Sequence, residues 1–358
     1  MATTQKEIAE MLGLSVMTVS LALRDSSKVK KETREKIVKL ANSINYSPSE
    51  IARSLVTGKS YTVGITLPGF SQTFYSERAE EIQKELNKKG YSGFALCGDT
   101  EDAWEKIIET FIRKKADDII AFNRSNYKSR FRLKEVGIPI VLSEYPVDLI
   151  DSWDRGRNNE EVNYVTCDKY QGGRIVMEHL VGLGYRKIGF ICRSRGNEER
   201  FAAYKDILLE HRLPFNREWV SDGGGFYANG YNGMKQLLAL SEKPEAVFAK
   251  NDVAAIGAMR AVKDAGLDVP GDVAVVGFDN IKEGEYSLVS LTTVDQKKEE
   301  IAQKLTEIIL KKIENKEDKN SYHMMIKPEL VIRESCGYKL KNAVETTHLE
   351  NLSRKSLE

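Results

Sequence analysis

Apolar residues in the first 44 positions recur at helical spacing, which predicts three short helices. Thr4 and Glu7 place a hydroxyl and a carboxylate three positions apart, the pattern of a capping box at the start of the first helix. Gly13 ends that helix, and a second helix is expected over 15–23. Because two short helices joined by a turn bury little surface, the apolar stripe over 31–44 is expected to complete a helix-turn-helix unit.

The pattern changes at Tyr61, where short apolar runs begin to alternate with amphipathic stretches. Eight runs predict strands: 63–67, 93–96, 119–122, 138–142, 164–167, 188–192, 246–249 and 273–278. Helical patterns separate most of them: 75–89, 169–183, 198–211, 226–240 and 252–265. Continuous apolar strands between helices are typical of parallel sheets covered on both faces. We therefore expect an α/β core of two doubly wound parallel-sheet subdomains, with a ligand crevice outside the carboxyl ends of the strands.

Composition narrows the class of protein and its compartment. The 358 residues exceed one compact core, and 41% hydrophobic content with a net charge of +1 is ordinary for a globular protein. The four cysteines form no CxxC pair and no Cys/His cluster, so neither disulfides nor a structural metal site is expected. No secretory pattern or long apolar run occurs, which predicts a cytoplasmic protein without a membrane partner. The polar, aperiodic residues 339–358 predict a mobile tail.

Basic residues concentrate in one short segment of this otherwise balanced chain. Seven bases lie within 24–39: Arg24, Lys28, Lys30, Lys31, Arg34, Lys36 and Lys39. Only three acids accompany them: Asp25, Glu32 and Glu35. The helical pattern alone leaves an unrelated three-helix bundle as an alternative. Phosphate contacts supply most of the non-specific affinity for DNA, so the local excess of charge favours a DNA-binding unit.

The stretch 6–60 resembles the DNA-binding end of the LacI/GalR repressor family. The matching pieces are Glu7-Ile8-Ala9, Gly13-Leu14-Ser15, Thr18-Val19-Ser20, Glu32-Thr33-Arg34, Tyr46-Ser47-Pro48, Ala52-Arg53-Ser54-Leu55 and Thr57-Gly58-Lys59-Ser60. The resemblance implies that helix 15–23 reads the major groove and that a hinge helix over 49–56 orders on operator DNA. It divides this end into a helix-turn-helix domain, 1–46, and a hinge with linker, 47–60.

The same resemblance suggests which side chains contact DNA. The candidates are Thr4, Ser15, Val16, Met17, Thr18, Ser20, Leu21, Lys28, Ala52, Arg53 and Leu55. Leu55 would enter the minor groove as an apolar wedge that opens a central base step, with Ala52 beside it. The alternative for Leu55 is a linker residue packed on the core. Many relatives carry polar residues near Val16, Met17 and Leu21, so methyl contacts and DNA shape are expected to carry more of the readout here.

The resemblance extends over about 4–337 and implies a core similar to periplasmic sugar-binding proteins. Its markers are Asp168, Gly172-Gly173-Arg174, Glu178-His179-Leu180, Gly184-Tyr185-Arg186, Arg200, Tyr204, Asn251-Asp252, Val269-Pro270, Val275-Val276-Gly277-Phe278-Asp279, Leu291-Thr292-Thr293-Val294 and Pro328-Glu329-Leu330-Val331. The implied effector-binding and dimerisation core is 61–338, and its chain crosses between two halves. The expected subdomains are about 61–160 with 292–322, and about 161–291 with 323–338.

Candidate effector-binding residues follow from the same resemblance: Phe74, Glu144, Asp168, Arg200, Phe226, Asn251 and Asp279. A guanidinium fork at Arg200 and a carboxylate at Asp279 suit hydroxyl-rich or heteroaromatic ligands, with a structural ion pair as the alternative. Phe226 matches a stacking aromatic, and its alternative is a core residue. Asp252 is a weaker candidate, because capping the helix that begins there would explain it equally well.

An enzyme is the main competing class, but the residues supply no catalytic constellation. Gly223-Gly224-Gly225 lacks the Lys-Ser/Thr of a phosphate loop, no GxGxxG follows a strand and no GxSxG occurs. The four histidines show no metal spacing. A sugar-binding protein without DNA activity would not need the first sixty residues. We therefore expect no enzymatic activity, no cofactor and no metal.

These observations predict a sequence-specific transcriptional repressor that binds double-stranded operator DNA as a homodimer. A small molecule between the two subdomains, a sugar or related metabolite, would control its operator affinity. A phosphorylated protein partner, as in the catabolite-control branch of the family, is the alternative for the allosteric input.

Overall fold

The computed structural model describes residues 4–23, 26–44, 46, 54, 57–122, 138–144, 163–193, 199–315, 317–318 and 320–338. The chain forms two compact units, Met1–Tyr61 and Thr62–Glu358, so the division falls one residue after the expected start of the core. The hinge residues Ala52, Arg53 and Leu55 and the tail 339–358 lie outside the described residues. Within the described part of the chain, no helix combines the length and the apolar character needed to span a membrane.

The N-terminal unit contains three helices: α1 (Gln5–Leu12), α2 (Val16–Leu23) and α3 (Lys31–Ser43). The expected capping box is present, because the Glu7 amide donates to Thr4 Oγ1 at 3.3 Å and the Thr4 amide donates to Glu7 Oε2 at 2.7 Å. Gly13 ends α1 at a φ of 64°, a left-handed conformation that costs glycine little. Each helix contributes a fully buried residue to one small core: Ile8, Val19 and Ile37.

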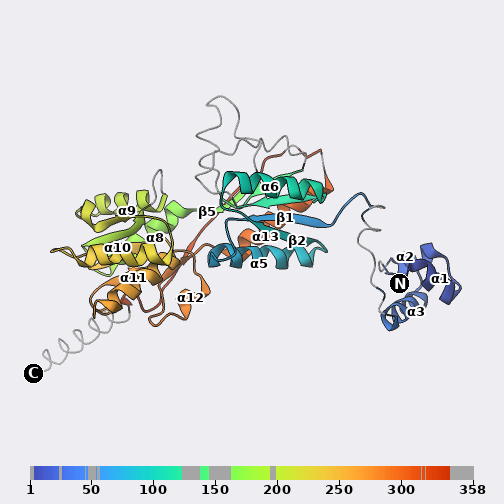
Figure 1. The fold of residues 1–358 in the computed structure, drawn as a ribbon, viewed down its shortest axis with the longest axis horizontal. Helices are drawn as coiled ribbons and strands as arrows, with labels where there is room; N and C mark the ends of the chain where they lie inside the picture. The colour runs from blue at the N-terminus through green and yellow to red at the C-terminus, as the bar shows by residue number, and fades with distance from the viewer. Residues whose placement is uncertain are drawn as a thin grey trace, which may run out of the picture. The chain divides into compact units, whose positions relative to one another are not determined.

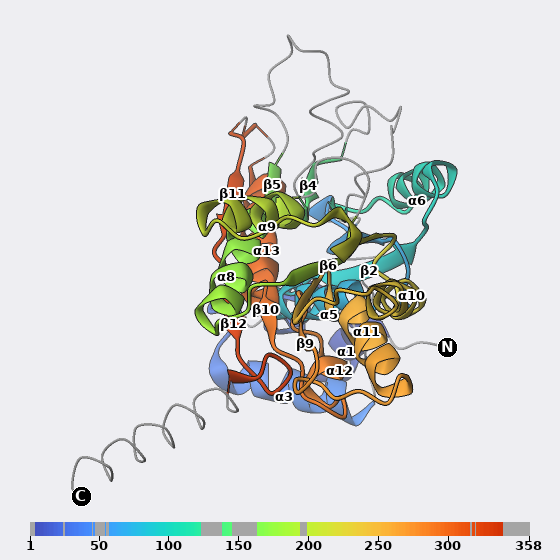
Figure 2. The ribbon, with the colours of Figure 1, turned by 90° about the vertical axis from the view of Figure 1, so that its left-hand side faces the viewer.

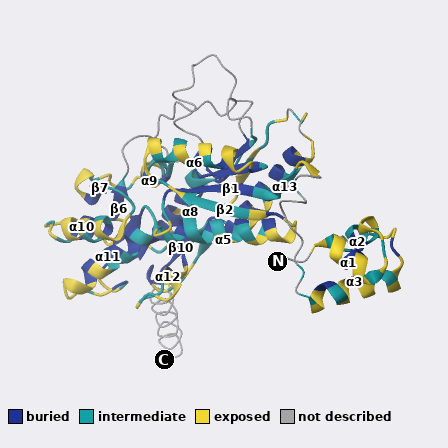
Figure 3. Cartoon of the chain, turned by 45° about the vertical axis from the view of Figure 1, so that its right-hand side comes forward, coloured by how far each residue is buried: buried dark blue, intermediate teal, exposed yellow. Residues whose placement is uncertain are grey.

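Six parallel strands form the larger sheet of the core, in the order β11-β5-β4-β3-β1-β2. They are β1 (Thr62–Leu67), β2 (Ser92–Cys97), β3 (Asp118–Ala121), β4 (Ile140–Leu142), β5 (Asn163–Cys167) and β11 (His323–Ile326). Helices α5 (Thr73–Lys88) and α13 (Lys298–Glu314) cover one face, and α6 (Glu101–Arg113) covers the other (Figure 1). Strands β1 and β3 are buried between these layers, whereas the outer faces of the helices are exposed (Figure 3).

Four parallel strands form the second sheet, in the order β7-β6-β8-β9. They are β6 (Ile188–Arg193), β7 (Val220–Asp222), β8 (Ala246–Ala249) and β9 (Ala274–Val276). Its helices are α8 (Lys169–Gly182), α9 (Glu199–Glu210), α10 (Tyr227–Leu238) and α11 (Asp252–Asp264), with the short α12 (Lys282–Glu285) and η3 (Arg217–Trp219). Phe190 and Phe248 pack under α8 and α9, whereas Ile191 and Val247 pack under α10 and α11. Because successive strand residues point to opposite, equally apolar faces, the strands form continuous apolar runs.

Three chain segments connect the two halves of the core. The chain passes from β5 directly into α8, and it returns between β9 and α13 through β10 (Thr293–Asp295). It passes a third time between β11 and β12 (Glu329–Val331), and β12 pairs with β10 in a two-stranded antiparallel sheet. After β12 the chain joins the second half, where the Val275 amide donates to the Ser335 carbonyl at 2.9 Å.

The expected limits of the subdomains are wrong at two strands. Both β5 and β11 were expected in the C-terminal half, but they belong to the six-stranded sheet of the N-terminal half. The physical reason is a parallel ladder in which His323 lies opposite Tyr164 and Ile326 lies opposite Cys167. The two strands accordingly lie side by side at one edge of that sheet (Figure 2).

Candidate functional site

The first turn of α2 exposes two large apolar side chains. Met17 is 68% exposed and Val16 is 46% exposed, while Val19 is fully buried. The Ser15 hydroxyl accepts the Thr18 amide at 3.1 Å and lies 2.8 Å from the Thr18 hydroxyl, so both polar groups are engaged in starting the helix. The apolar pair is therefore the part of this turn that is most open to a partner.

The other residues expected to contact DNA differ in their exposure and in their contacts within the protein. Lys28 is exposed, and Ser20 is partly exposed. Leu21 packs partly against the small core, so it stabilises the unit as well as bordering the surface. The Thr4 hydroxyl is committed to the capping box. Three expected contacts of the hinge lie outside the described residues and stay predictions: Ala52, Arg53 and Leu55.

A buried arginine connects the two halves of the core. Arg78 of α5 is 0% exposed, and its Nη1 donates to the Ser143 carbonyl and to Glu144 Oε1, both at 2.9 Å. Its Nη2 donates to Gln296 Oε1 at 3.0 Å, and Gln296 Nε2 donates to Asp279 Oδ1 at 2.6 Å. A chain of direct hydrogen bonds therefore runs from the first half, through the connection after β10, to the end of β9.

Glu144 receives two cations. Arg78 binds its Oε1, and Lys169, the first residue of α8, forms an ion pair with its Oε2. Burial would raise the pKa of Glu144, but Lys169 and Arg78 outweigh burial and hold the pKa below its ordinary value. Burial would lower the pKa of Lys169, but the charge of Glu144 raises the pKa overall. Both groups of this pair are therefore ionised at neutral pH.

The Asp279 carboxyl lies at the other end of this chain of hydrogen bonds. Burial, followed by the charge of Asp252, raises its pKa to about 7, even though Arg200 acts in the opposite direction. Asp279 also adopts a φ of 126°, a conformation that L residues rarely take. Such strain is stable only where surrounding contacts fix the backbone, and it is found mainly at binding sites.

Asp252 lies near Asp279, and its charge raises the pKa of the Asp279 carboxyl. It is completely buried, accepts the Thr293 hydroxyl at 2.5 Å and accepts the Ile281 amide at 2.9 Å. Burial raises its pKa to about 6. The suggestion that Asp252 caps α11 is wrong, because the cap is Asn251, whose Oδ1 accepts the Ala254 amide at 3.0 Å.

Arg200 lies in the first turn of α9 and is largely buried. Its guanidinium stacks 5.0 Å from the centre of the Phe278 ring, the residue before Asp279. The positive charge of Arg200 opposes the rise in the pKa of Asp279 and of Lys169, and it adds to the lowering of the pKa of Glu144. Arg200 therefore belongs to the same electrostatic site.

Of the remaining candidate effector-binding residues, two make contacts within the protein and one is an exposed aromatic residue. Phe74 is buried, and its ring centre lies 4.3 Å below the guanidinium of Arg78. Asp168 caps α8 by accepting the Gln171 amide at 2.8 Å. Phe226, at the start of α10, is 47% exposed, so its alternative as a core residue is wrong.

Sequence reasoning missed four members of this site: Tyr75, Arg78, Lys169 and Gln296. The available signal was the position of Arg78, because the buried stripe of α5 is Phe74, Arg78, Ile82 and Leu86. A charged residue in an apolar stripe with a period of four must find a partner inside the protein. Tyr75 is partly buried near the same charges, and desolvation followed by the charge of Glu144 raises the pKa of its hydroxyl.

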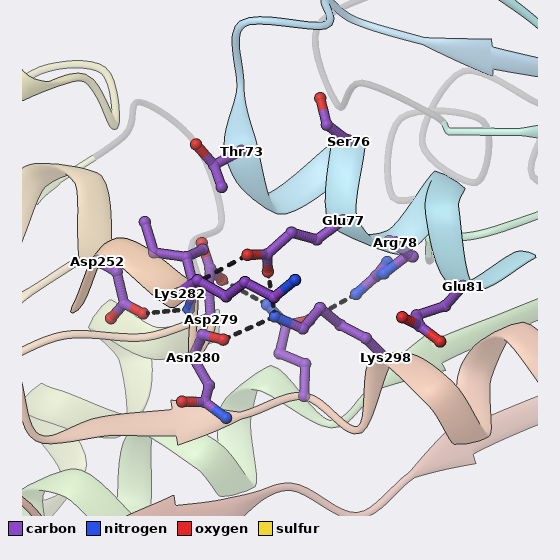
Figure 4. Close-up of polar contacts among 12 residues, drawn as sticks. Thr73, Ser76, Glu77, Arg78, Glu81, Asp252, Asp279, Asn280, Lys282 and Lys298 are labelled. Carbon is purple, nitrogen blue, oxygen red and sulfur yellow. Dashed lines mark hydrogen bonds and ion pairs between the residues drawn. The ribbon is translucent and has the colours of Figure 1, made fainter. Parts of the chain in front are cut away.

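A second polar cluster joins the halves at the start of α5. Glu77 accepts the Lys282 amide at 3.1 Å and forms an ion pair with Lys298 (Figure 4). Thr73 donates its hydroxyl to Glu283 at 2.7 Å. The residues around a polar cavity of about 180 Å³ at this junction are Glu77, Glu80, Glu81, Asn280, Ile281, Lys282, Glu285, Asp295, Lys298, Glu299 and Arg333. This cluster links α5 to α12 and α13.

The described residues form neither a metal-binding cluster nor a disulfide. Among them, no group of three or more histidine, cysteine or acidic side chains could hold a metal ion. The four cysteines are free thiols, and burial raises the pKa of Cys192 to about 11 and of Cys167 to about 12.

The chain is similar to known regulators along almost its whole length. Residues 4–49 match the model of bacterial regulatory proteins of the lacI family, and residues 177–336 match a periplasmic binding protein-like domain. The chain is 30% identical over 340 residues to the HTH-type transcriptional repressor PurR of Mannheimia succiniciproducens, which covers 93% of this chain and 98% of that protein. The corresponding protein of Haemophilus influenzae is 29% identical over 340 residues, with the same two coverages.

Solved structures share the fold. The lac repressor dimer bound to operator and the anti-inducer ONPF matches with a TM-score of 0.76 and 21% identity, over 94% of this chain and 99% of that one. The complex of the transcriptional regulator CelR with cellobiose matches with a TM-score of 0.68 and 24% identity, over 93% and 99%. The chain belongs to the lacI family of bacterial regulatory proteins. It is thus a DNA-binding transcriptional regulator and not an enzyme.

Proposed function

We propose that this regulator is a homodimeric repressor whose operator affinity changes when a small metabolite binds between the two halves of its core. The observation that carries the proposal is the buried path Glu144–Arg78–Gln296–Asp279, which joins both halves at the carboxyl ends of their strands. Ligands of doubly wound folds bind at this edge of the sheets. A ligand that contacts this path meets residues of both halves at once.

The DNA contacts follow from the exposed turn of α2. In the proposed complex, α2 lies in the major groove, where Val16 and Met17 contact the methyl groups and sugar edges of the operator. Leu55 from each protomer enters the minor groove at the centre of a pseudo-palindromic site and kinks the DNA. Lys28 contacts the phosphate backbone.

The effector contacts are assigned to Arg200, Asp279 and Phe226. Arg200 and Asp279 offer a guanidinium donor and a carboxyl group to polar substituents, and the exposed ring of Phe226 offers a stacking face. Phe74, Glu144, Asp168 and Asn251 act behind them. The guanidinium of Arg78 lies over the ring of Phe74, both carboxylate oxygens of Glu144 are paired, and Asp168 and Asn251 cap helices. This division separates residues that bind the effector from residues that hold the site in place.

Control of DNA affinity requires the effector to bind one arrangement of the halves better than the other. A ligand shifts an equilibrium only by the difference between its affinities for the two states. The hydrogen bonds Thr73–Glu283 and Glu77–Lys282, which join the halves outside the effector site, would be broken or kept as the halves rotate. The change of the core would then alter the spacing of the two hinge segments on DNA.

The first test is binding of the purified protein to its own upstream DNA, titrated against salt with and without a panel of sugars and nucleobases. Footprinted binding that one compound weakens or strengthens supports the proposal. Arg200→Ala and Asp279→Asn should then remove the response to that compound while the protein stays folded by circular dichroism. A retained response in both variants would exclude them from the effector site. Salt-sensitive binding without a footprint would contradict sequence-specific operator recognition.

A further inference from the structure

We propose that the Asp279 carboxyl makes the joining of the two halves of the core depend on pH. With a proton on this group the halves stay joined, and loss of the proton favours their separation. This response goes beyond the proposed function, because it needs neither an operator nor a metabolite. It follows from where the carboxyl lies and from the groups that surround it.

Asp279 lies close to the contacts that join the two halves. Helix α12 of the second half begins three residues later at Lys282, whose amide donates to Glu77 Oε1 of α5 at 3.1 Å (Figure 4). The next residue, Glu283, accepts the Thr73 hydroxyl of α5 at 2.7 Å. A change of charge at Asp279 therefore acts near the junction of the two halves.

The Asp279 side chain is enclosed by groups of both halves. Asp279 is 4% exposed, and its Oδ1 accepts Gln296 Nε2 at 2.6 Å. Gln296 Oε1 in turn accepts Nη2 of Arg78, on α5 of the first half, at 3.0 Å. Separation of the halves moves α5 away from this path and admits water to the carboxyl.

Burial favours the protonated form of Asp279 in the joined arrangement. A carboxylate loses more hydration energy on burial than a neutral carboxyl does. Burial is accordingly the largest cause that raises the pKa of Asp279 to about 7, from an ordinary 3.8. When the halves separate, water returns, the pKa falls and the proton is released. The joined arrangement therefore gains stability below pH 7 and loses it as pH rises through 7.

A second buried carboxyl, Asp252, packs against the loop that carries Asp279. The Asp252 amide donates to the Phe278 carbonyl at 2.8 Å, and Asp252 Oδ2 accepts the Ile281 amide at 2.9 Å. The charge of Asp252 is the second cause that raises the pKa of Asp279. Both carboxyls belong to the second half, so Asp252 favours protonation of Asp279 in either arrangement. Burial by the first half supplies the difference between the two.

The described charges that act on Asp279 come from three helices. Arg200 of α9 and Arg78 of α5 lower its pKa, but burial and Asp252 of α11 outweigh them. Tyr75 of α5 interacts with the same carboxyl, and desolvation raises the pKa of its hydroxyl, so Tyr75 stays neutral near pH 7. The charged residues beyond Arg78 are Glu144, Lys169 and the helix cap Asp168.

Two described carboxyls at this junction have a pKa near neutrality. They are Asp279 and Asp252, whose pKa burial raises to about 6. No described histidine lies on α5, α11, α12 or the segment between β10 and α13. Substitution of Asp279 therefore decides whether this carboxyl carries the response.

The test measures hydrogen exchange of the Lys282 amide in the full chain at pH 6 and pH 8, without operator or metabolite. Mass spectrometry with fragmentation to single residues gives each rate, which is corrected for the pH dependence of free amides. Because this amide is bonded across the junction, its protection reports how far the halves are joined. One proton bound in the joined arrangement should make the protection roughly 5–10-fold higher at pH 6 than at pH 8.

The Val275 amide is the internal control. It donates to the Ser335 carbonyl at 2.9 Å, and both residues belong to the second half. Separation of the halves leaves this bond in place, so its protection should change by less than about twofold between the two pH values.

Two substitutions assign the response to Asp279. Asp279→Asn keeps an acceptor oxygen for Gln296 but cannot ionise, so it should show the high protection of Lys282 at both pH values. The matched control is Asp264→Asn, which removes a surface carboxylate at the end of α11 and should keep the wild-type response. If Asp279→Asn unfolds, Asp252→Asn replaces it. Loss of the Asp252 charge lowers the pKa of Asp279, so the change between pH 8 and pH 6 should shrink.

Three outcomes would overturn this response to pH. They are equal protection of Lys282 at the two pH values in the wild type, an unreduced change in Asp279→Asn or its replacement, and parallel changes of the Lys282 and Val275 amides. The last would mean that pH acts on the whole second half and not on the junction. Because no operator or metabolite takes part, each outcome is independent of the proposed function.

Discussion

The helix-turn-helix unit and the buried site of the core carry their candidate functional residues in opposite ways. In the small unit, the apolar side chains of Val16 and Met17 face solvent, and the core beneath them comes from three neighbouring helices. In the site of the core, Arg78 is buried and binds partners 66 and 218 residues away along the chain. Because a buried charge is costly unless it is paired, stability and binding depend on the same residues in this site. In the small unit, residues that stabilise the fold and residues that are exposed for binding are separate.

The largest effect is expected for Arg78→Met. The substitution leaves Ser143 and Gln296 without their donor and removes one of the two cations on Glu144. We expect the core to lose about 3–5 kcal/mol of unfolding free energy, the usual cost of removing one partner of a buried ion pair. Urea denaturation followed by the fluorescence of the buried Trp219 measures this loss.

The matched control for Arg78 is Arg260→Met. Arg260 pairs with Asp264 at 2.8 Å on the surface of α11, with a largely exposed side chain. Exposed pairs contribute about 0–1 kcal/mol, so this variant should unfold nearly like the wild type. Equal losses of unfolding free energy in the two variants would show that the buried pair of Arg78 stabilises the core no more than an exposed pair does.

A somewhat smaller and strictly local loss is expected for Ile37→Ala. Ile37 is fully buried in the core of the helix-turn-helix unit, and its truncation should cost that unit about 3 kcal/mol. Operator binding should fall with the folded fraction of this unit. The unfolding of the core should not change, because the two parts are separate compact units. A shift of the core transition in denaturation would contradict this independence.

The pH dependence of the core tests the Asp279 carboxyl. Its pKa is raised to about 7 from the ordinary 3.8, so the folded protein binds a proton that the unfolded chain has lost. Stability associated with this group is complete below about pH 4 and declines as pH rises through 7, with a slope of up to about 1.4 kcal/mol per pH unit. Asp279→Asn should flatten the decline in unfolding free energy between pH 5 and 7. An unchanged slope would exclude Asp279 as its source.

The smallest change in stability is expected for Met17→Ala. Its side chain is exposed, so the unfolding free energy should change by less than about 0.5 kcal/mol. Operator affinity should nevertheless fall roughly tenfold, which corresponds to about 1.4 kcal/mol of lost apolar contact. Met11→Ala is the control, because Met11 is similarly exposed but lies on α1. Equal losses of affinity would mean that α2 has no special role in reading DNA.

Much of the fold was predictable because it is encoded locally. The capping box at Thr4 and Glu7, the stripes of three helices and all eight expected strands are present. Four short strands were not expected, namely β7, β10, β11 and β12, because three or four residues that include polar ones give no apolar run. The placement of β5 and β11 was wrong because the register between residues 164 and 323 is a long-range property of the sheet.

The candidate site was predictable only in part. The sequence indicated Arg200, Asp279 and Glu144, which the structure brings into one electrostatic site. It did not indicate which of the candidates would be buried supports, since the burial of Phe74 beneath Arg78 depends on packing. It also missed Arg78 and Gln296, whose partners lie on other segments. Charges at apolar positions of a helix were the signal that could have found Arg78.

The pairing of β11 with β5 has a consequence for biosynthesis. The first half of the core cannot complete its sheet until Ile326 has left the ribosome, about 160 residues after β5. At about 5–20 residues per second, the edge of β5 waits roughly 8–30 s for its partner strand. During that interval an unpaired strand edge is open to other chains, which is a recognised route to aggregation. The yield of folded protein should therefore depend on chaperone protection of this half, and a chain that ends before residue 323 should lack a stable first half.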